Sequence, residues 1–180
     1  IIEEHLDGNR THYLAFIDCE GLDIPWNTME KLLQCNGDLI FNFQTSQINR
    51  TFGKYKSGHI HDETIHRFFG DVDLSQARSG EDLLEIYKNN IEEYRDLVED
   101  ILIRGGSRFG DFHYNLIFAT KKTKGGSPWF KAVRHLKSRI EKHSGEAVEK
   151  AFDILSGRIR ELGWFVNDDQ DFQRSLFDFE

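Results

Sequence analysis

The chain has 180 residues, which is the usual length of one domain. Hydrophobic residues make up 38% and charged residues 30% of the sequence, a balance that indicates a folded globular chain and excludes intrinsic disorder. The net charge of −8 excludes a uniformly basic nucleic-acid-binding protein, although a local basic patch is compatible with it. No apolar run approaches the ~20 residues of a membrane span, and two cysteines form no disulfide framework. We therefore expect a cytoplasmic protein without a membrane partner.

The first half of the chain predicts two parallel strands joined by a helix. The short apolar run Tyr13–Ile17 is typical of a strand that is buried on both faces, as in a parallel sheet. A short helix is expected over Thr28–Leu33, and a second strand over Asp38–Phe43. The polar, glycine-bearing stretch Gln47–Gly58 is expected to be mainly loop with some helix.

The second half predicts an antiparallel hairpin with helices before and after it. Its strands are expected at Leu97–Ile103 and Phe112–Thr120, joined by the glycine-rich turn Gly105–Asp111. Helices are expected at four places: Asp62–Phe69 with Asp62 as N-cap, Ser79–Asp96, Pro128–His143 and Ala147–Leu162. The fold expected is a single α/β domain, residues 1–166, whose mixed sheet has parallel strands followed by an antiparallel hairpin and is flanked by helices, with an acidic tail at 167–180.

Polar side chains follow the two predicted parallel strands. Open α/β sheets place their sites at the carboxyl ends of such strands. We expect Asp18 and Glu20 to orient a nucleophile or act as general bases. The substrate-binding candidates are Gly21, Asn42, Asn49 and Arg50. The alternative for Asp18 is a purely structural role as a turn or capping residue.

Three further groups carry weaker signals. His59, His61 and His66 could ligate zinc, but no cysteine stands at metal spacing, so a solvated loop without metal is favoured. Lys121, Lys122 and Lys124 precede a predicted helix and could meet phosphates, including those of a nucleic acid; a charged loop is favoured because no P-loop spacing is present. Cys19 stands beside two acids, which disfavour a nucleophilic thiolate.

The order of several short motifs is similar to that of one protein family. Phe16–Leu22 (Phe-Ile-Asp-Cys-Glu-Gly-Leu) resembles the Phe-Leu-Asp-Pro-Tyr/Glu-Gly-Leu signature of the three-Cys-motif partner (TcmP) proteins. Ile24–Leu33 resembles the helix that follows this signature, and Asp38–Phe43 resembles the next strand. Tyr114–Thr120 (Tyr-Asn-Leu-Ile-Phe-Ala-Thr) is the most specific match in the second half. The similarity covers about residues 12–130 well.

This resemblance implies a Rossmann-like, class I methyltransferase-like fold and a three-Cys-motif radical-SAM-type protein as partner. In such folds the strand that ends in Asp18 is the fourth strand of the sheet. The resemblance also implies that the glycine-rich loop for S-adenosylmethionine precedes residue 1, so the chain is expected to be the C-terminal part of a larger domain. We therefore expect the complete protein, but not this chain alone, to bind S-adenosylmethionine. The strand at residues 13–17 is expected to pair with that N-terminal half or with another chain.

Two functional hypotheses follow from the resemblance. The first is the substrate-side half of a methyltransferase-like enzyme that uses S-adenosylmethionine. The second is a non-catalytic partner, or a nucleic-acid-processing accessory protein, with a degenerate methyltransferase fold. Cys19 stands where the family has Pro, and Lys121 follows Thr120 where the family continues with Asn-His-Pro. A glycine-rich S-adenosylmethionine loop in the complete protein would favour the first hypothesis.

Overall fold

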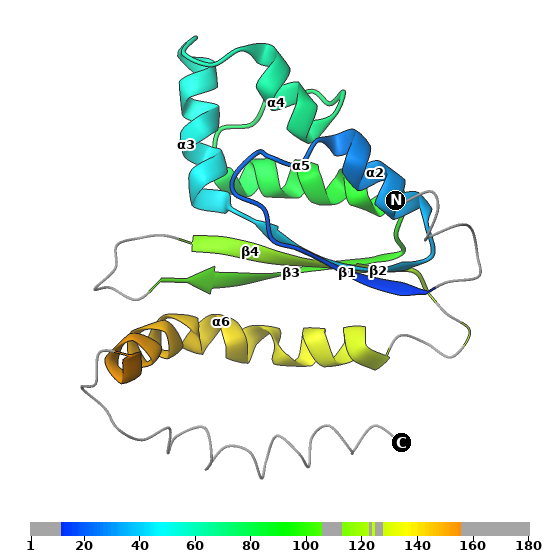
Figure 1. Cartoon of the computed structure of the whole chain (residues 1–180), viewed down its shortest axis with the longest axis vertical. Coiled ribbons are helices and arrows are strands. Elements are labelled where there is room, and N and C mark those ends of the chain that lie inside the picture. Colours follow the sequence, from blue (N-terminus) through cyan, green and yellow to red (C-terminus); the bar gives the residue numbers. More distant parts are fainter. Residues whose placement is uncertain (1–11, 106–112, 123, 125–127, 156–180) are drawn as a thin grey trace.

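The computed structural model describes residues 12–105, 113–122, 124 and 128–155. They form a four-stranded sheet with helices on both faces (Figure 1). Four helices cover one face, and one long helix, α6 (Pro128–Leu155), lies along the other. The expected α/β class with a mixed, helix-flanked sheet is therefore confirmed. The expected tail at 167–180 lies outside the described residues.

The strands are β1 (Tyr13–Ile17), β2 (Gly37–Phe43), β3 (Leu97–Arg104) and β4 (His113–Thr120). Their order in the sheet is β1-β2-β4-β3. β1 and β2 pair in parallel, while β4 is antiparallel to both β2 and β3. The predicted parallel pair and the predicted antiparallel hairpin are both confirmed, and the predicted strand ends are correct to within one residue. Most of the expected turn at 105–111 lies outside the described residues.

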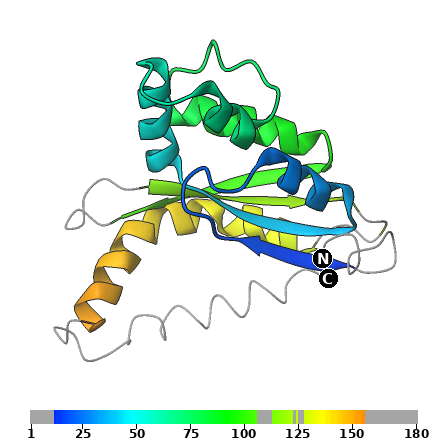
Figure 2. The same cartoon turned by 45° about the horizontal axis from the view of Figure 1, so that its top comes forward.

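The burial expected for β1 is wrong, because this strand lies at the rim of the sheet (Figure 2). Its side chains alternate between half-buried and exposed, and Leu14 and Phe16 are 63% and 62% exposed. Phe16 lies beside Ile40 of β2, which in turn lies beside Phe118 of β4. Since the Phe118 ring packs against Trp129 of α6, these side chains belong to the α6 face of the sheet. The helix covers β3 and leaves the β1 part of this face bare.

The helices on the other face are α2 (Trp26–Gln34), α3 (Thr45–Lys56), α4 (Asp62–Phe69) and α5 (Gly80–Glu92). α2, α4 and α5 were predicted, although α5 ends earlier than expected and the N-cap of α4 is His61 rather than Asp62. Ser79 caps α5: its hydroxyl accepts from the Asp82 N–H at 3.1 Å, and the Asp82 carboxylate accepts from the Ser79 N–H at 3.0 Å. This capping box explains why that helix start could be predicted from the sequence.

Two helical segments differ from expectation. The stretch expected to be loop with some helix is almost entirely the regular helix α3, which buries Thr45, Ile48 and Phe52 at helical spacing. Gly53 interrupts the apolar pattern there, yet one glycine costs a helix only about 1 kcal/mol. The two helices expected after Pro128 are one continuous helix as far as Leu155, through Gly145. The expected residues 156–162 lie outside the described part of the chain.

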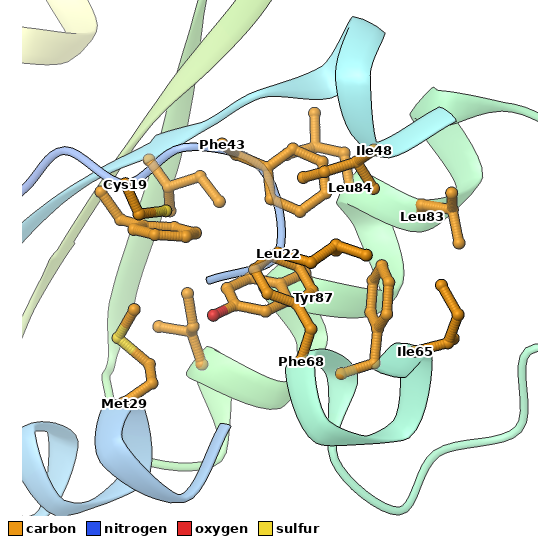
Figure 3. Packing of buried hydrophobic residues seen from close by; sticks show 14 of the residues in the cluster. Cys19, Leu22, Met29, Phe43, Ile48, Ile65, Phe68, Leu83, Leu84 and Tyr87 are labelled. Carbon is orange, nitrogen blue, oxygen red and sulfur yellow. The ribbon is translucent and has the colours of Figure 1, made fainter. Parts of the chain in front are cut away.

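Aromatic rings form the centre of the core between the sheet and its four helices (Figure 3). Tyr87 of α5 is fully buried, and its ring stacks on Phe41 and Phe68 at centroid distances of 5.3 and 4.9 Å. Phe43 and Trp26 pack against the same ring at 5.4 Å each. Burial raises the pKa of Tyr87 well above its usual value, so the phenol stays neutral. The core therefore holds the β2 backbone firmly from one side.

The two edges of the sheet are built differently. At β3, the Glu141 carboxylate of α6 accepts a hydrogen bond from the Leu102 N–H at 3.1 Å. Glu99 on the same strand binds Lys137 and Arg134 of α6 at 2.8 and 3.0 Å. Charged side chains of this kind protect a sheet edge from further pairing.

β1 has no charged residue between Tyr13 and Ile17, and no described strand pairs with its outer edge. Among the helices that the structure describes, none combines the length and apolar character needed to cross a membrane.

Candidate functional site

The predicted site begins with a contact between the ends of the two parallel strands. Asn42 donates a hydrogen bond from Nδ2 to Asp18 Oδ1 at 2.7 Å. Alternation along β1 and β2 places both residues on the α6 face, opposite the buried Phe41 and Phe43. Asp18 is exposed, whereas Asn42 is 8% exposed. The buried amide therefore holds one oxygen of an accessible carboxylate in a fixed position.

Asn42 carries an uncompensated polar atom. Its Oδ1 is buried and has no hydrogen-bond partner, because Asp18 requires the Nδ2 group on its side. A buried polar group without a partner costs about 1–3 kcal/mol. An apolar residue of similar size would avoid this cost, so Asn42 is not explained by stability alone. Among the described residues, the bond to Asp18 is the one hydrogen bond of its side chain.

Tyr114 at the start of β4 belongs to the same site. Tyr114 stands two residues before Leu116, the β4 partner of Asn42, so strand alternation puts it on the same face of the sheet as Asn42. Burial raises the pKa of its phenol, and the negative charge of Asp18 raises that pKa further. The phenol consequently stays protonated and can donate a hydrogen bond. Tyr114 was not predicted as a site residue, although it opens the Tyr114–Thr120 stretch that carries the strongest resemblance in the second half.

The turn after β1 is closely packed against α3. Gly21 has a positive φ of 65°, and an ideal Cβ there would lie 2.7 Å from Gln47 Nε2. The space in front of Gly21 is therefore taken by the Gln47 amide, which makes Gln47 a second site residue that was not predicted. Glu20 is exposed on this turn, and no hydrogen bond within the described part of the chain fixes it.

Asn49 and Arg50 are both exposed on α3. The Cβ of Asn49 would lie 3.3 Å from a Cβ at Gly80, so Asn49 is at the start of α5. Arg50 donates from Nε to the Ser46 carbonyl of its own helix at 3.3 Å. Of the predicted residues, the structure thus joins Asp18 and Asn42 by a direct contact. It places Asn49 beside α5, and it ties Arg50 to its own helix.

Hydrogen bonds fix the start of α3 beside β4. The Ser46 hydroxyl accepts from the His113 N–H at 2.8 Å and donates to the His113 carbonyl at 2.9 Å. The His113 ring approaches the same hydroxyl through Nδ1 at 3.0 Å. One residue earlier, Thr45 donates to Asn115 Oδ1 at 2.6 Å. These bonds hold Gln47, and with it the Gly21 turn, in place.

A buried ionic pair supports this arrangement. Asn115 donates to Asp100 Oδ2 at 2.8 Å, and Lys88 of α5 donates to Asp100 Oδ1 at 2.9 Å. Burial alone would raise the pKa of Asp100, but the hydrogen bonds and charge of Lys88 outweigh it and lower that pKa. The carboxylate therefore stays charged and links α5, β3 and β4. Its role is structural, because both of its oxygens are already engaged.

The cysteines and histidines that the sequence offered as candidates have structural rather than chemical roles. Burial raises the pKa of the Cys19 thiol to about 11, so this residue is not a nucleophile at neutral pH. Cys19 and Cys35 are free thiols. His59 approaches the Ser57 hydroxyl through Nδ1 at 2.8 Å, and His61 is the N-cap of α4. In the described ranges, no three His, Cys, Asp or Glu side chains lie together as metal ligands would.

A cavity of about 520 Å³ lies between α3 and α4 and is lined by Tyr55, Lys56, His66 and residues 72–75. None of the predicted site residues lines it. Lys56 donates to the Ala77 carbonyl, and Asp73 accepts from the Ser75 N–H at 2.8 Å. The polar groups there serve the chain itself, so this cavity is a weaker candidate than the Asp18 edge.

Comparison with known proteins adds no assignment. No protein-family model matches the sequence, and no significant match exists among curated proteins or among solved structures.

The chemistry of the site follows from two functional groups, the Asp18 carboxylate and the Tyr114 phenol. Asp18 offers a fixed carboxylate oxygen that accepts hydrogen bonds, and Tyr114 offers a protonated phenol that donates them. A ligand group with both a proton and a lone pair, such as an amine or a hydroxyl, can use both. Because the site lies at the carboxyl ends of two parallel strands, it has the position that α/β proteins use for ligand binding.

Proposed function

We propose that the chain is the substrate-side half of a TcmP-like protein that is methyltransferase-like and uses S-adenosylmethionine, together with a radical-SAM-type partner. The observation that carries the proposal is the exposed Asp18 carboxylate, held at 2.7 Å by the buried Asn42 at the carboxyl ends of β1 and β2. In this role Asp18 orients the nucleophilic atom of the substrate. Glu20, on the exposed turn that follows, is the second acid of the proposed site.

The strand order supports a Rossmann-like sheet. In the doubly wound order 3-2-1-4-5-6, the fourth strand pairs with the fifth on one side and with the first on the other. β1 pairs in parallel with β2 on one side, and on its other side it has no partner among the strands that the structure describes. If β1 is the fourth strand, as the resemblance implies, the ligand crevice lies between β1 and the strand that would pair with it. Asp18 then stands at the rim of that crevice.

The bare surface of β1 supports the same proposal. An added parallel strand would pair with the open edge, and the helix that connects such strands would cover Leu14 and Phe16. Both requirements are present at β1 and neither is present at β3, where α6 occupies the edge. The cofactor would be held by the added half, because Gly21, the glycine that follows β1, faces Gln47 instead of open space.

The second hypothesis, a non-catalytic partner with a degenerate fold, is favoured by one observation. The Gln47 amide fills the space at Gly21, so the turn after β1 offers no backbone cradle to a ligand. A chain that serves only as a partner would keep the sheet and its edges but would not need the Asp18–Asn42 contact. The unpartnered Oδ1 of Asn42 therefore favours the enzyme.

The test uses the protein at its natural length with methyl-labelled S-adenosylmethionine and fractions of a cell extract as acceptors. We expect transfer of the label by the wild type and a loss of about 10²–10⁴-fold in Asp18→Ala. Asp18→Asn keeps the acceptor for Asn42 but removes the charge, and it serves as the matched variant. Equal transfer by all three proteins, with unchanged melting, would reduce Asp18 to a turn residue and would favour the non-catalytic hypothesis.

A further inference from the structure

Basic and acidic residues are distributed very unevenly along the chain. The stretch from Lys121 to Arg139 holds seven Lys and Arg residues and no Asp or Glu, although the whole chain has 23 basic and 31 acidic residues. In the fold this stretch is the connection between β4 and α6 together with the first half of α6. A cationic surface therefore exists on a protein that otherwise repels polyanions.

Four of the seven basic side chains of this stretch are exposed. Lys122, Lys124 and Lys131 are exposed, and no ion pair joins any of the three to a described residue. Lys131, Arg134, His135 and Ser138 are three and four residues apart on α6 and are all exposed, so they form one outer stripe. Arg134 is fixed by Glu99 at 3.0 Å and by the Phe130 ring, 5.3 Å from its guanidinium, yet remains 57% exposed. The stripe is thus partly preorganised.

Three described acids that lie on α6 or contact it or the residues before it, Asp96, Glu99 and Glu141, already have partners. Glu99 binds Arg134 and Lys137, and its carboxylate is 20% exposed. Asp96 accepts from the Lys122 N–H at 2.8 Å, and Glu141 accepts from the Leu102 N–H at 3.1 Å. These carboxylates turn toward the sheet and its edges, so they neutralise the outer stripe only in part.

We infer that the outer face of α6, together with Lys122 and Lys124 that precede it, binds the phosphate backbone of a nucleic acid. From Lys131 to Ser138 the helix rises about 10 Å, which matches about three phosphates of one strand. A row of separate cations without a closed pocket suits a repeating anion better than a single small one. The described side chains of this surface are mainly cations, which contact phosphates rather than base edges, so we expect binding that is independent of sequence.

An anionic membrane is the competing partner, and the apolar side of α6 disfavours it. Membrane-surface helices insert large apolar side chains between lipids. On α6 those side chains point to the sheet: Phe130 is 2% exposed, and Trp129 packs on Phe118 at 6.3 Å. Ile140, at 37% exposed, is the single exposed large hydrophobic side chain among the described residues of α6.

This inference goes beyond the proposed methyl transfer and does not depend on it. β4 begins at His113 beside Ser46, near the proposed site, and ends at Thr120 beside Asp38, at the start of β2. The basic connection therefore leaves the sheet at the end opposite to Asp18. The surface would hold a nucleic acid along the flank of the protein rather than present a base to the Asp18 carboxylate.

The test is fluorescence anisotropy of the 180-residue chain with labelled oligonucleotides of about 20 nucleotides, as single-stranded DNA, single-stranded RNA and duplex DNA. We expect dissociation constants of about 10⁻⁴–10⁻⁶ M and a log–log salt slope of about −3 between about 50 and 200 mM salt. Single-strand preference or duplex preference each support the surface and tell which form it prefers.

A charge-matched pair of variants locates the binding. The triple variant Lys122→Glu, Lys124→Glu, Lys131→Glu should weaken binding by about tenfold or more. The control Lys54→Glu, Arg67→Glu, Arg78→Glu changes the net charge equally at exposed positions of the opposite helical layer and should change the affinity by less than about twofold. Circular dichroism verifies that both are folded. Equal losses in the two variants, no binding of any oligonucleotide at the lowest salt, or binding to phosphatidylserine vesicles alone would overturn the inference.

Discussion

The Glu141 carboxylate of α6 accepts a hydrogen bond from the backbone N–H of Leu102 at 3.1 Å, so a helix side chain occupies the free side of β3. At the opposite edge, no residue that the structure describes gives β1 such protection. Leu14 and Phe16 of β1 are 63% and 62% exposed beside an unpaired edge. One edge of this sheet is therefore closed by its own chain, and the other is available to a further strand.

The first prediction concerns that open edge. We expect the 180-residue chain to self-associate through this edge, and Phe16→Lys to reduce that association, because a lysine on an edge strand opposes further pairing. The free energy of unfolding should change by less than about 0.5 kcal/mol, since the side chain is mostly exposed. Sedimentation equilibrium measures the association. Ile140→Lys, at an exposed position of α6, is the control and should leave the association unchanged.

The second prediction concerns Asn42. Asn42→Leu should leave the free energy of unfolding unchanged or raise it by up to about 1 kcal/mol, because it removes a buried oxygen without a partner. Asn115→Leu is the matched control: Asn115 is 5% exposed, but its amide is bonded to Thr45 and to Asp100. Losing these bonds should cost about 2–4 kcal/mol. Urea denaturation measures the free energy of unfolding of both variants. An equal loss of stability in the two would mean that the Asn42 amide has a structural role.

The third prediction concerns the pair formed by Lys88 and Asp100, whose side chains are 14% and 12% exposed. Asp100→Asn leaves the Lys88 charge without its buried partner and should cost about 3 kcal/mol. Glu85 also binds Lys88 at 2.9 Å but is 61% exposed. Glu85→Gln should therefore cost less than about 1 kcal/mol. Chemical denaturation of both variants at neutral pH would show the contrast, which comparable losses would contradict.

The fourth prediction is the pH dependence of that contribution. The pKa of Asp100 is lower in the folded protein than its ordinary value of 3.8, chiefly because Lys88 outweighs the effect of burial. The unfolded state thus takes up the proton first, and the stabilisation is complete well above pH 3.8. It is lost as the pH falls below that value toward the folded pKa. The stability difference between wild type and Asp100→Asn should accordingly be constant near neutral pH and shrink in acid. If the stability difference between the two proteins grows on acidification, the pKa of Asp100 is not lowered by folding, and the prediction is wrong.

The amino-acid sequence determined the local elements wherever periodicity and end signals agree. The apolar runs before Asp18 and Phe43, the Ser79 capping box and the strand before Lys121 each fix an element through near neighbours in the chain. The intervening helix and the hairpin also determined which strand pairs are parallel and which are antiparallel. The same reasoning predicted too little helix for α3 and divided α6 in two. Both helices contain a glycine, which indicates a helix end in a sequence but costs a packed helix only about 1 kcal/mol.

Only the tertiary structure decided what surrounds each side chain. The apolar residues of β1 predicted burial, but the strand order puts β1 at an edge and exposes Phe16. Asp18 and Asn42 could be assigned to one crevice from their strand ends, whereas Gln47 and Tyr114 could not, because they reach the site through packing of α3 and through the antiparallel course of β4. Short-range patterns set the backbone of each element, while contacts between distant segments depend on strand order and register, which no local pattern contains.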